Sequence, residues 1–485
     1  MKILVINEPF VKDFCRTQRW AARTRGRVLR APDWLAYATA VLEREGEDVE
    51  LYDFPAEGWD KDKLRDLVRR KQPDMVVLDA TTPSIYSDIE CAKIVKEEAD
   101  SKVIMVGPHV SAVPEGTLND ARGCVDVVCR GEYDYIIRDV VGCFEGDKNL
   151  GDILGISYLD KNGVIKHNAN RPLIRNLDEL PFPAWHHLDI MKYFDGQKLY
   201  PYIDIISGRG CPNRCIFCLW PQVMHGLEYR LRSPENVVDE MEFDVENWPE
   251  VKKGEIFFED DTFTVNKKRA MQICDEILDR GLEVEVTWSV NARADDGDFE
   301  LFGKMKKAGC RELLVGFESG DQGMLDRMNK HLTLEQSKDF VKIAHKAGLV
   351  VHGCFVLGLP GETKETMEKT VKFALDLNID TVQFSAAMPF PGTEYYKICE
   401  ENGLIKARSW EDWLDEGEQS TVVEYPGLSK EEIEYYVDKG LKKFYFRPRY
   451  MINFLLNTRS LPDLYRKMRG FKNFTSYLIS KGVKR

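Results

Sequence analysis

The chain lacks the features of a membrane-spanning or secreted protein. Among its 485 residues, no run approaches the about 20 apolar residues that a spanning helix requires. The first residues, MKILVINEPF, lack the basic segment and apolar stretch that mark a secretory signal. Twelve cysteines in such a chain favour metal binding over disulfides. We therefore expect a cytoplasmic protein, or one on the cytoplasmic face of a membrane.

Positive charge is scarce over most of the chain and concentrated at its end. The net charge is −13, yet residues 439–485 hold 13 Lys and Arg against one acidic residue, Asp463. A basic tail on an acidic body favours contact with an anionic surface. The alternative is that the tail packs on the body and its cations face water. No nucleic-acid-binding motif accompanies the charge, so no nucleic acid partner is expected.

Strand and helix patterns alternate through residues 1–150. Five short runs rich in Val and Ile are typical of buried parallel strands, at residues 2–7, 48–54, 74–80, 102–107 and 125–131. Amphipathic helical patterns lie between them. The alternation predicts a doubly wound, Rossmann-like α/β sheet, whose ligands bind beyond the carboxyl ends of the strands. Ordinary connecting loops are the alternative interpretation of those strand ends.

The remaining chain divides into three further parts. Residues 151–198 hold a hairpin pattern with an Asn-Gly turn and then a proline-rich stretch, which indicates a linker. Six strand–helix units over residues 199–410 predict a partial (β/α)6 TIM-like barrel. Residues 411–485 form a small, helical, basic C-terminal region. Polar residues that follow the barrel strands are expected at the reaction site: Cys211, Glu259, Asp261, Asn291, Arg293, Glu318, Ser319 and Gln383.

Three cysteines follow the first barrel strand, in SGRGCPNRCIFCLW (residues 207–220). A structural zinc site needs four protein ligands, and no fourth Cys or His stands at ligand spacing. Three thiolates hold three irons of a 4Fe–4S cluster and leave the fourth open to a small molecule. Cys211, Cys215 and Cys218 are therefore predicted cluster ligands. The alternatives are an incomplete zinc site, with His225 the nearest downstream histidine, or three unrelated buried cysteines.

The Cys-x3-Cys-x2-Cys spacing, with Phe217 before the last cysteine, resembles the signature of radical S-adenosylmethionine (SAM) enzymes. Members of that family bind the amino and carboxylate groups of SAM to the open iron. One electron then cleaves SAM to methionine and a 5′-deoxyadenosyl radical, which abstracts hydrogen from the substrate. The resemblance implies a 4Fe–4S cluster, SAM and an external electron donor similar to flavodoxin or ferredoxin.

The resemblance also implies which residues contact SAM. FFEDD stands where the family has Gly-Gly-Glu, with two phenylalanines in place of the glycines, so Glu259 is implied to accept from the methionine ammonium. Ser289 and Arg293, in WSVNARAD, match positions that contact ribose and carboxylate, and arginine binds a carboxylate in a bidentate pair. Glu318, in GFESG, is implied at the ribose or carboxylate end. Residues 354–363, CFVLGLPGET, match the adenine-binding segment.

The N-terminal α/β domain resembles the cobalamin-binding domain that precedes the barrel in one radical SAM subclass. Its implied cobalamin contacts lie in the third-, fourth- and fifth-strand loops, at Thr82, Ser84, Gly107, Ser111, Gly131 and Glu132. The Asp-x-His-x-x-Gly loop that supplies a cobalt ligand in many cobalamin proteins is absent, because NEPFVKDFCRTQRW (residues 7–20) contains no histidine. We therefore expect cobalamin without an imidazole from that loop, and we expect His109 to shape its own loop.

Nearly the whole chain resembles the group of the anaerobic magnesium-protoporphyrin cyclase and the hopanoid-linked radical enzymes, above all the type that forms the ribosylhopane cyclitol ether. Residues 15–43, 219–241 and 444–450 carry this resemblance. It implies hydrogen abstraction from a hydrophobic lipid- or tetrapyrrole-like substrate, leading to ring rearrangement or cyclisation. Cobalamin-dependent C-methylation is the alternative. A tRNA methylthiotransferase and a non-enzymatic cobalamin sensor are alternatives of other classes.

A lipid substrate would have to leave a bilayer, which gives the basic tail a second interpretation. Short amphipathic helices are expected around residues 449–457 and 473–485, with basic residues at their edges. Such helices lie in a membrane interface, where each Lys or Arg gains about 1 kcal/mol near an anionic surface. The sequence therefore predicts peripheral membrane contact through this tail.

Overall fold

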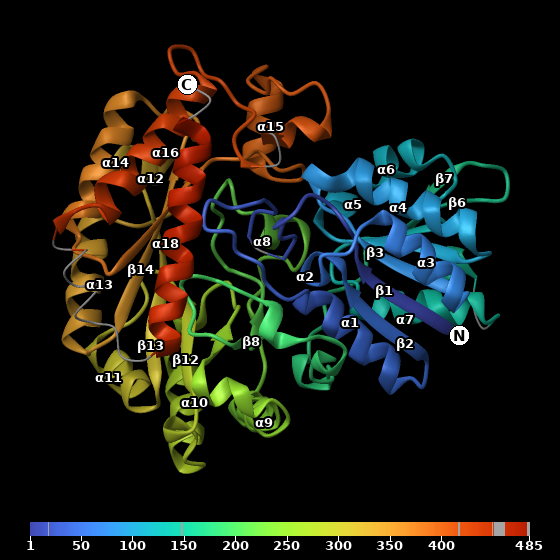
Figure 1. The fold of residues 1–485 in the computed structure, drawn as a ribbon, viewed down its shortest axis with the longest axis horizontal. Coiled ribbons are helices and arrows are strands. Elements are labelled where there is room, and N and C mark those ends of the chain that lie inside the picture. The colour runs from blue at the N-terminus through green and yellow to red at the C-terminus, as the bar shows by residue number, and fades with distance from the viewer. Residues whose placement is uncertain (18, 147–148, 416–417, 449, 451–460, 483–485) are drawn as a thin grey trace.

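The computed structural model describes residues 1–485 except 18, 147–148, 416–417, 449, 451–460 and 483–485. Figure 1 shows two bodies side by side, an N-terminal α/β body in blue and teal and a barrel body in green, yellow and orange. Each body is built around its own mainly parallel sheet. In the part of the chain described, no helix is long and apolar enough to cross a membrane.

The N-terminal sheet contains all five predicted strands. They are β1 (Lys2–Asn7), β2 (Asp48–Asp53), β3 (Met75–Asp79), β4 (Lys102–Val106) and β5 (Val127–Cys129), parallel in the order β2-β1-β3-β4-β5. Alternate side chains of β1 enter different cores. Ile3 and Val5 pack with the helices of one face, and Leu4 and Ile6 pack with those of the other. Because helices cover both faces of the sheet, side chains on both sides of the central strands β1, β3 and β4 are buried, and these strand sequences are nearly continuous apolar runs.

Helices cover both faces of this sheet. One core contains residues of α1 (Asp33–Arg44) and α7 (Asp134–Phe144), and the other contains residues of α3 (Lys61–Lys71) and α4 (Ile85–Glu98). This is the doubly wound arrangement that the sequence predicted. The hairpin predicted within the linker forms β6 (Ile156–Leu159) and β7 (Ile165–His167), which extend the sheet antiparallel beyond β5. The sheet thus reaches His167, and domain boundaries at 150, 198 and 410 stay predictions.

The second sheet is an incomplete barrel. Its strands are β8 (Tyr202–Ile205), β11 (Glu255–Phe258), β12 (Thr287–Ala292), β13 (Cys310–Glu318), β14 (Val350–Leu357) and β15 (Thr381–Ala386), all parallel and in this order. The intervening helices include α9 (Pro234–Asn247), α10 (Lys267–Asp279), α11 (Phe299–Lys307), α13 (Leu334–Lys346) and α14 (Lys364–Asp376). Among the described residues, β8 and β15 pair on one side only, so the barrel is open between them.

The C-terminal region covers that opening with α16 (Lys430–Tyr445) and α18 (Leu461–Gly482). The hydroxyl of Tyr445 bonds to both the amide and the carbonyl of Val382 in β15. Arg466 and Asn473 of α18 donate to the carbonyls of Gly196 and Gly26, at 2.6 and 3.1 Å. α18, red in Figure 1, thus runs beside the barrel strands.

One side of α18 carries exposed apolar side chains. Tyr465, Met468, Phe471 and Ile479 are 46–67% exposed, and helical spacing places them on one side. The helix predicted at residues 473–485 belongs to α18 as far as Gly482. The predicted helix at residues 449–457 lies, apart from residue 450, outside the described residues.

The loop between β1 and α1 joins all parts of the molecule. We call residues 16–30 the arginine segment, of which Gln18 is not described. Its arginines bind carboxylates from the α/β body, the linker, the barrel and the C-terminal region. The pairs are Arg16–Asp88 (2.7 Å), Arg19–Asp261, Arg25–Asp438 (2.9 Å), Arg27–Glu418 (2.6 Å), Arg30–Asp195 and Arg30–Glu259 (both 3.0 Å).

Candidate cofactor site

The three cysteines lie on a loop between β9 (Gly208–Arg209) and α8 (Leu219–Val223). Cys211 and Cys215 are buried, Cys218 is half-buried, and all three are free thiols. The side-chain amide of Gln222 donates to the carbonyls of residues 215, 216 and 218, at 3.2, 3.2 and 2.7 Å. These bonds fix the loop before any metal binds. The residue before Cys211 must be glycine, because a Cβ on Gly210 would lie 2.1 Å from the carbonyl oxygen of Glu228.

The spacing of the three sulfurs argues against a single zinc ion. Zinc binds sulfur at about 2.3 Å in tetrahedral sites, which places two sulfurs about 3.8 Å apart. Within the described ranges, only Glu43, His186 and His187 have three ligand atoms that all lie within 4.8 Å of one another. At least one distance between the three sulfurs is therefore longer. The donor set of three free thiols suits a larger cluster.

The two aspartates after β11 hold the two ends of the cysteine loop. Asp260 accepts from the amides of Ser207 and Gly208, at 2.6 and 3.0 Å, and from the Ser207 hydroxyl at 2.6 Å. Asp261 pairs with His225 Nε2 at 2.6 Å and with Arg19. Burial alone would raise the pKa of Asp261, but the charges of His225 and Arg19 outweigh it and hold the pKa well below its usual range.

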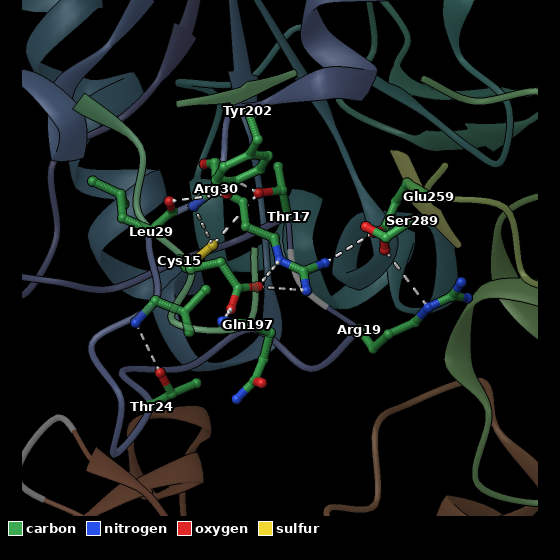
Figure 2. Close-up of polar contacts among 12 residues, drawn as sticks. Cys15, Thr17, Arg19, Thr24, Leu29, Arg30, Gln197, Tyr202, Glu259 and Ser289 are labelled. Atoms are coloured by element: carbon green, nitrogen blue, oxygen red, sulfur yellow. Dashed lines mark hydrogen bonds and ion pairs between the residues drawn. The ribbon is translucent and has the colours of Figure 1, made fainter. Parts of the chain in front are cut away.

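Glu259 follows β11 and is bound by the arginine segment. Its Oε2 accepts from Arg30 Nη1 at 3.0 Å, and its Oε1 lies 3.8 Å from Arg19 Nε. Figure 2 shows the Glu259 carboxylate between these two guanidinium groups. The predicted role of Glu259, acceptance from the methionine ammonium, stays a prediction. In this structure the ammonium would have to share the carboxylate with these arginines.

The two phenylalanines that replace the expected glycines point to opposite faces of the sheet. Phe257 lies in the barrel interior, where the Lys198 ammonium sits over its ring. Phe258 packs outward against Phe263 and Trp288. Strand alternation therefore leaves only one of the two rings inside the barrel.

A second cluster of charges borders the cysteine loop. Lys330 Nζ donates to Glu318 Oε1 at 2.8 Å, and Arg293 Nη2 donates to the Lys330 carbonyl at 2.8 Å. The thiols of Cys211 and Cys215 interact electrostatically with Arg293. Glu318 has a φ of +64° beside a register shift between β13 and β14, so the local backbone turns its side chain. The structure thus brings Arg293 and Glu318 to the cysteine loop, together with Lys330, which no sequence pattern indicated.

Ser289 lies apart from this group. Its hydroxyl donates to Glu255 Oε1 at 3.1 Å, and Glu255 also binds Arg311. Glu255 begins β11, whereas the cysteine loop follows the carboxyl end of β8. The structure therefore directs this hydroxyl toward the amino ends of the strands. A contact between Ser289 and SAM stays a prediction.

The predicted cobalamin residues of the fourth- and fifth-strand loops meet at one hydroxyl. Ser111 Oγ donates to the Gly107 carbonyl at 2.7 Å and accepts from the Gly131 amide at 3.0 Å. Gly107 has a φ of +103°, and a Cβ there would lie 2.5 Å from Asp79 Oδ1. Only glycine allows the third- and fourth-strand loops to approach this closely.

Thr82 and Ser84 belong to the same carboxyl edge of the sheet. Thr82 Oγ1 lies 3.1 Å from His109 Nδ1, and Ser84 Oγ donates to Asp88 at 2.6 Å. His109 is buried and packs edge-on against Trp410, and burial lowers its pKa to about 3. These contacts give His109 the loop-shaping position expected from the sequence.

Glu132 engages the barrel body instead of an open surface. Its two oxygens accept from Arg230 at 2.7 and 2.8 Å, and the Ile174 amide donates to it at 3.0 Å. Both side chains of the pair are buried. Loss of one partner of such a pair costs about 3–5 kcal/mol. The structure thus gives Glu132 a role in joining the two bodies, and a contact with cobalamin stays a prediction.

One buried polar atom at this edge has no partner among the described residues. Glu8 follows β1, and its Oε1 makes no hydrogen bond, while its Oε2 accepts from the Asp79 amide at 3.1 Å. Burial, together with the negative charge of Asp88, raises the pKa of Glu8 well above its usual range. An unpartnered carboxyl oxygen at the same carboxyl edge of the sheet as Thr82 and Ser84 suits a polar ligand such as cobalamin.

Comparisons with known proteins agree with this geometry. The family model of the radical SAM superfamily matches residues 205–374, and that of the B12 binding domain matches residues 31–141. An uncharacterized methyltransferase of Pyrococcus horikoshii is 34% identical over 93% of this chain and 94% of its own length. The anaerobic magnesium-protoporphyrin IX monomethyl ester cyclase of Cereibacter sphaeroides is 31% identical over 76% of this chain and 60% of its own length.

A solved structure shares the fold along the whole chain. The radical SAM methyltransferase TsrM of Kitasatospora setae, with cobalamin and a 4Fe–4S cluster bound, matches with a TM-score of 0.72 and 17% identity. The match covers 99% of this chain and 100% of TsrM. The predicted fold class is thereby confirmed.

Replacing any one of Cys211, Cys215 or Cys218 by Ala should abolish the cluster and all SAM cleavage, because two thiolates cannot retain three irons. Iron quantitation and visible absorbance of anaerobically reconstituted protein measure the first effect, with about four irons expected for the unaltered chain. Cys274→Ala is the matched control, since Cys274 is buried in α10. Cluster absorbance that survives in one of the three loop variants would contradict the assignment.

Cobalamin should bind with no protein histidine on cobalt. Titration with hydroxocobalamin, reduction to the cobalt(II) state and electron paramagnetic resonance should show no superhyperfine splitting from an imidazole nitrogen. His109→Ala should leave that signal unchanged, because His109 is held by Thr82 and Trp410. Nitrogen splitting that disappears in this variant would make His109 a cobalt ligand and refute the prediction.

Proposed function

Because this chain belongs to the radical SAM superfamily and carries a B12 binding domain before its barrel, we propose that it is a cobalamin-dependent C-methyltransferase acting on a hydrophobic substrate. The enzyme uses a 4Fe–4S cluster, SAM and cobalamin. Together these groups supply reductive cleavage of SAM and carriage of a methyl group. The family resemblance of the sequence favours ring rearrangement or cyclisation, with methylation as the alternative. The relative with 34% identity over 94% of its length is named a methyltransferase, which supports the reversed order.

One observation carries the dependence on cobalamin: the segment that follows the cysteine loop, residues 219–230, contacts the loops predicted to bind the corrin. Met224, which follows α8, places its sulfur 3.6 Å from the Ser111 hydroxyl. A Cβ on Gly131 would lie 3.3 Å from the Met224 carbonyl. Arg230 binds Glu132 across the same contact. Two cofactors held by these loops would face each other, as methyl transfer between them requires.

The chain's own residues prepare this site for a zwitterionic ligand. Arg293 and Lys330 lie beside Cys215, paired with Asp295 and Glu318. A carboxylate that binds there would compete with these two partners. Glu259 presents negative charge on the neighbouring strand end, where an ammonium can bind. Gln222 and Asp260 hold the cysteine loop in place. An electron donor must reach the same loop, and a flavodoxin- or ferredoxin-like protein is the proposed source.

Cyclisation is the second candidate, because the 31% identical relative is a cyclase of a tetrapyrrole ester. This chain spans 60% of that relative's length, so the cyclase's activity is carried over only as an alternative. Both candidate reactions use the same cofactors and differ in the products formed from SAM, because only methyl transfer requires S-adenosylhomocysteine.

Reduced, reconstituted enzyme should convert SAM into two products, 5′-deoxyadenosine and S-adenosylhomocysteine. S-adenosylhomocysteine formation reports loss of the methyl group from SAM, which cyclisation does not require. Liquid chromatography with mass spectrometry of reactions with methyl-deuterated SAM measures both products. Cys211→Ala is the control and should form no 5′-deoxyadenosine. Formation of 5′-deoxyadenosine alone would favour cyclisation and reject methyl transfer.

We also propose peripheral membrane contact through α18. Its exposed apolar side, at Tyr465, Met468, Phe471 and Ile479, adjoins the basic residues Lys467 and Lys472. An apolar stripe edged by cations suits an anionic interface. A lipid substrate would have to leave a bilayer to reach the enzyme, and the inner face of the cytoplasmic membrane is the surface proposed for this contact.

Full-length protein should co-sediment with vesicles containing anionic lipid at low salt and should dissociate as salt is raised. Tyr465→Glu and Ile479→Glu should weaken this association, because both side chains are exposed, at 58% and 67%. Phe299→Glu, on α11, is the matched control. Truncation after Gly440 is a less specific test, since it also removes the Tyr445 bonds to β15. Absence of co-sedimentation at low salt would contradict the membrane proposal.

A further inference from the structure

We infer that the cavity beneath α18, on the open side of the barrel, is the substrate site, and that it takes an amphiphile with an apolar body and an anionic group. This inference rests on the proposed function and names its substrate class. The cavity has a volume of about 580 Å³, within the range of about 300–1,000 Å³ that ligand pockets occupy. Its wall on the barrel side includes Leu314, His352 and Gln383, one residue from each of β13, β14 and β15.

The cavity lies where, in the described part of the chain, β8 and β15 do not pair with each other and α18 covers the opening between them. α18 reaches the protein through bonds to Gly196 and Gly26, and between them it presents Gly470 to the cavity. A Cβ on Gly470 would meet no atom within 4 Å. The space is therefore open where a larger side chain would have filled it.

The lining is apolar over most of its surface. Phe384 of β15, Leu441 and Tyr445 of α16, and Met468, Phe471 and Phe474 of α18 all line it. Met468 and Phe471 are also 60% and 46% exposed, so they mark the side where the cavity meets solvent. An apolar body that enters here is covered by aromatic and aliphatic side chains.

The charged residues around the cavity are mostly cations. The lining contains Arg25, Arg30, Arg466, Lys467 and Lys472, against one carboxylate, Asp195. Burial lowers the pKa of His352 to about 4, so this histidine is neutral at pH 7. Arg25 is paired with Asp438, and Arg30 is paired with Asp195 and Glu259. Lys472 of α18 is therefore the cation of the lining that attracts an anionic group of the ligand.

The cavity connects to the cofactor site through a single side chain. Arg30 lines the cavity and extends its Nη1 to Glu259, on the strand end beside the cysteine loop. Figure 2 shows this guanidinium reaching from its own loop to the Glu259 carboxylate. The cavity and the reaction site are therefore adjacent, and a substrate in the cavity reaches the strand end of Glu259 past the Arg30 side chain.

Filling the cavity tests the inference. Gly470→Trp should place a ring in the open space, and Gly303→Trp is the matched control, since Gly303 is helical and its Cβ also meets no atom within 4 Å. Replacing a helical glycine favours the helix in both variants, so neither should unfold the protein. The probe is 11-(dansylamino)undecanoate, titrated by fluorescence into the full-length holoenzyme. Gly470→Trp should weaken binding at least about tenfold, and Gly303→Trp should leave it unchanged.

Competition tests the charge preference. Hexadecanoate should displace the probe at least about tenfold better than hexadecan-1-ol does. Lys472→Glu should reduce the affinity for hexadecanoate, and Lys342→Glu, an exposed lysine of α13, should not. Equal binding by Gly470→Trp and the unaltered chain would overturn the site. Equal displacement by the acid and the alcohol would overturn the anionic preference.

The same protein preparations distinguish failure of this inference from failure of the proposed function. Each is also assayed for 5′-deoxyadenosine and S-adenosylhomocysteine. SAM cleavage with methyl loss, but without probe binding in the cavity, would overturn the inference and leave the proposed function standing. Probe binding that Gly470→Trp removes, in a protein that does not cleave SAM, would support the site and reject the proposed function.

Discussion

The burial of arginine charge in the arginine segment is the constraint on which the rest of the structure depends. A guanidinium keeps its charge when buried, so each one needs a carboxylate that reaches it from elsewhere in the chain. Arg16 and Asp88, both fully buried, tie the segment to the α/β body. Arg30 ties it to the linker and to the barrel. Because loss of one partner leaves an uncompensated charge, these pairs fix how the two bodies meet.

The ion pairs of the arginine segment also position the cofactor site. Arg19 and Arg30 bind the acidic residues that end β11, and Asp261 in turn binds His225 beyond the cysteine loop. The loop of thiols is therefore positioned by groups from the N-terminal segment, as well as by its own strand. Burial raises the pKa of the Cys218 thiol well above its usual range, and the charge of Arg19 opposes that shift. Arg293 likewise places positive charge beside the thiols of Cys211 and Cys215.

Local patterns predicted the elements and the thiol loop, whereas long-range pairing decided the individual polar contacts. Apolar periodicity suffices for β1 to β5 and for the six barrel strands, because each pattern is complete within a few residues. Glu132 illustrates the limit: its loop suggested a cofactor contact, yet its partner Arg230 lies 98 residues away. Lys330 stands in no motif, and Gln222 lies in a stretch that carried only a family resemblance; the role of each is recognised only when the fold brings it to the cysteine loop. Ser289 matched a motif, but its hydrogen bond leads to Glu255.

Because α18 lies at the end of the chain, the residues proposed for cofactor binding and those that form the outer wall of the large cavity occupy different parts of the sequence. The residues proposed to hold the cofactors lie before residue 420, while the outer wall of the large cavity comes from one C-terminal helix of 22 residues. Substitutions in that helix change the size and charge of the space and leave the thiol loop and the strand ends untouched. Substrate range can therefore diverge, in evolution or by directed replacement of this helix, while the radical chemistry is inherited intact.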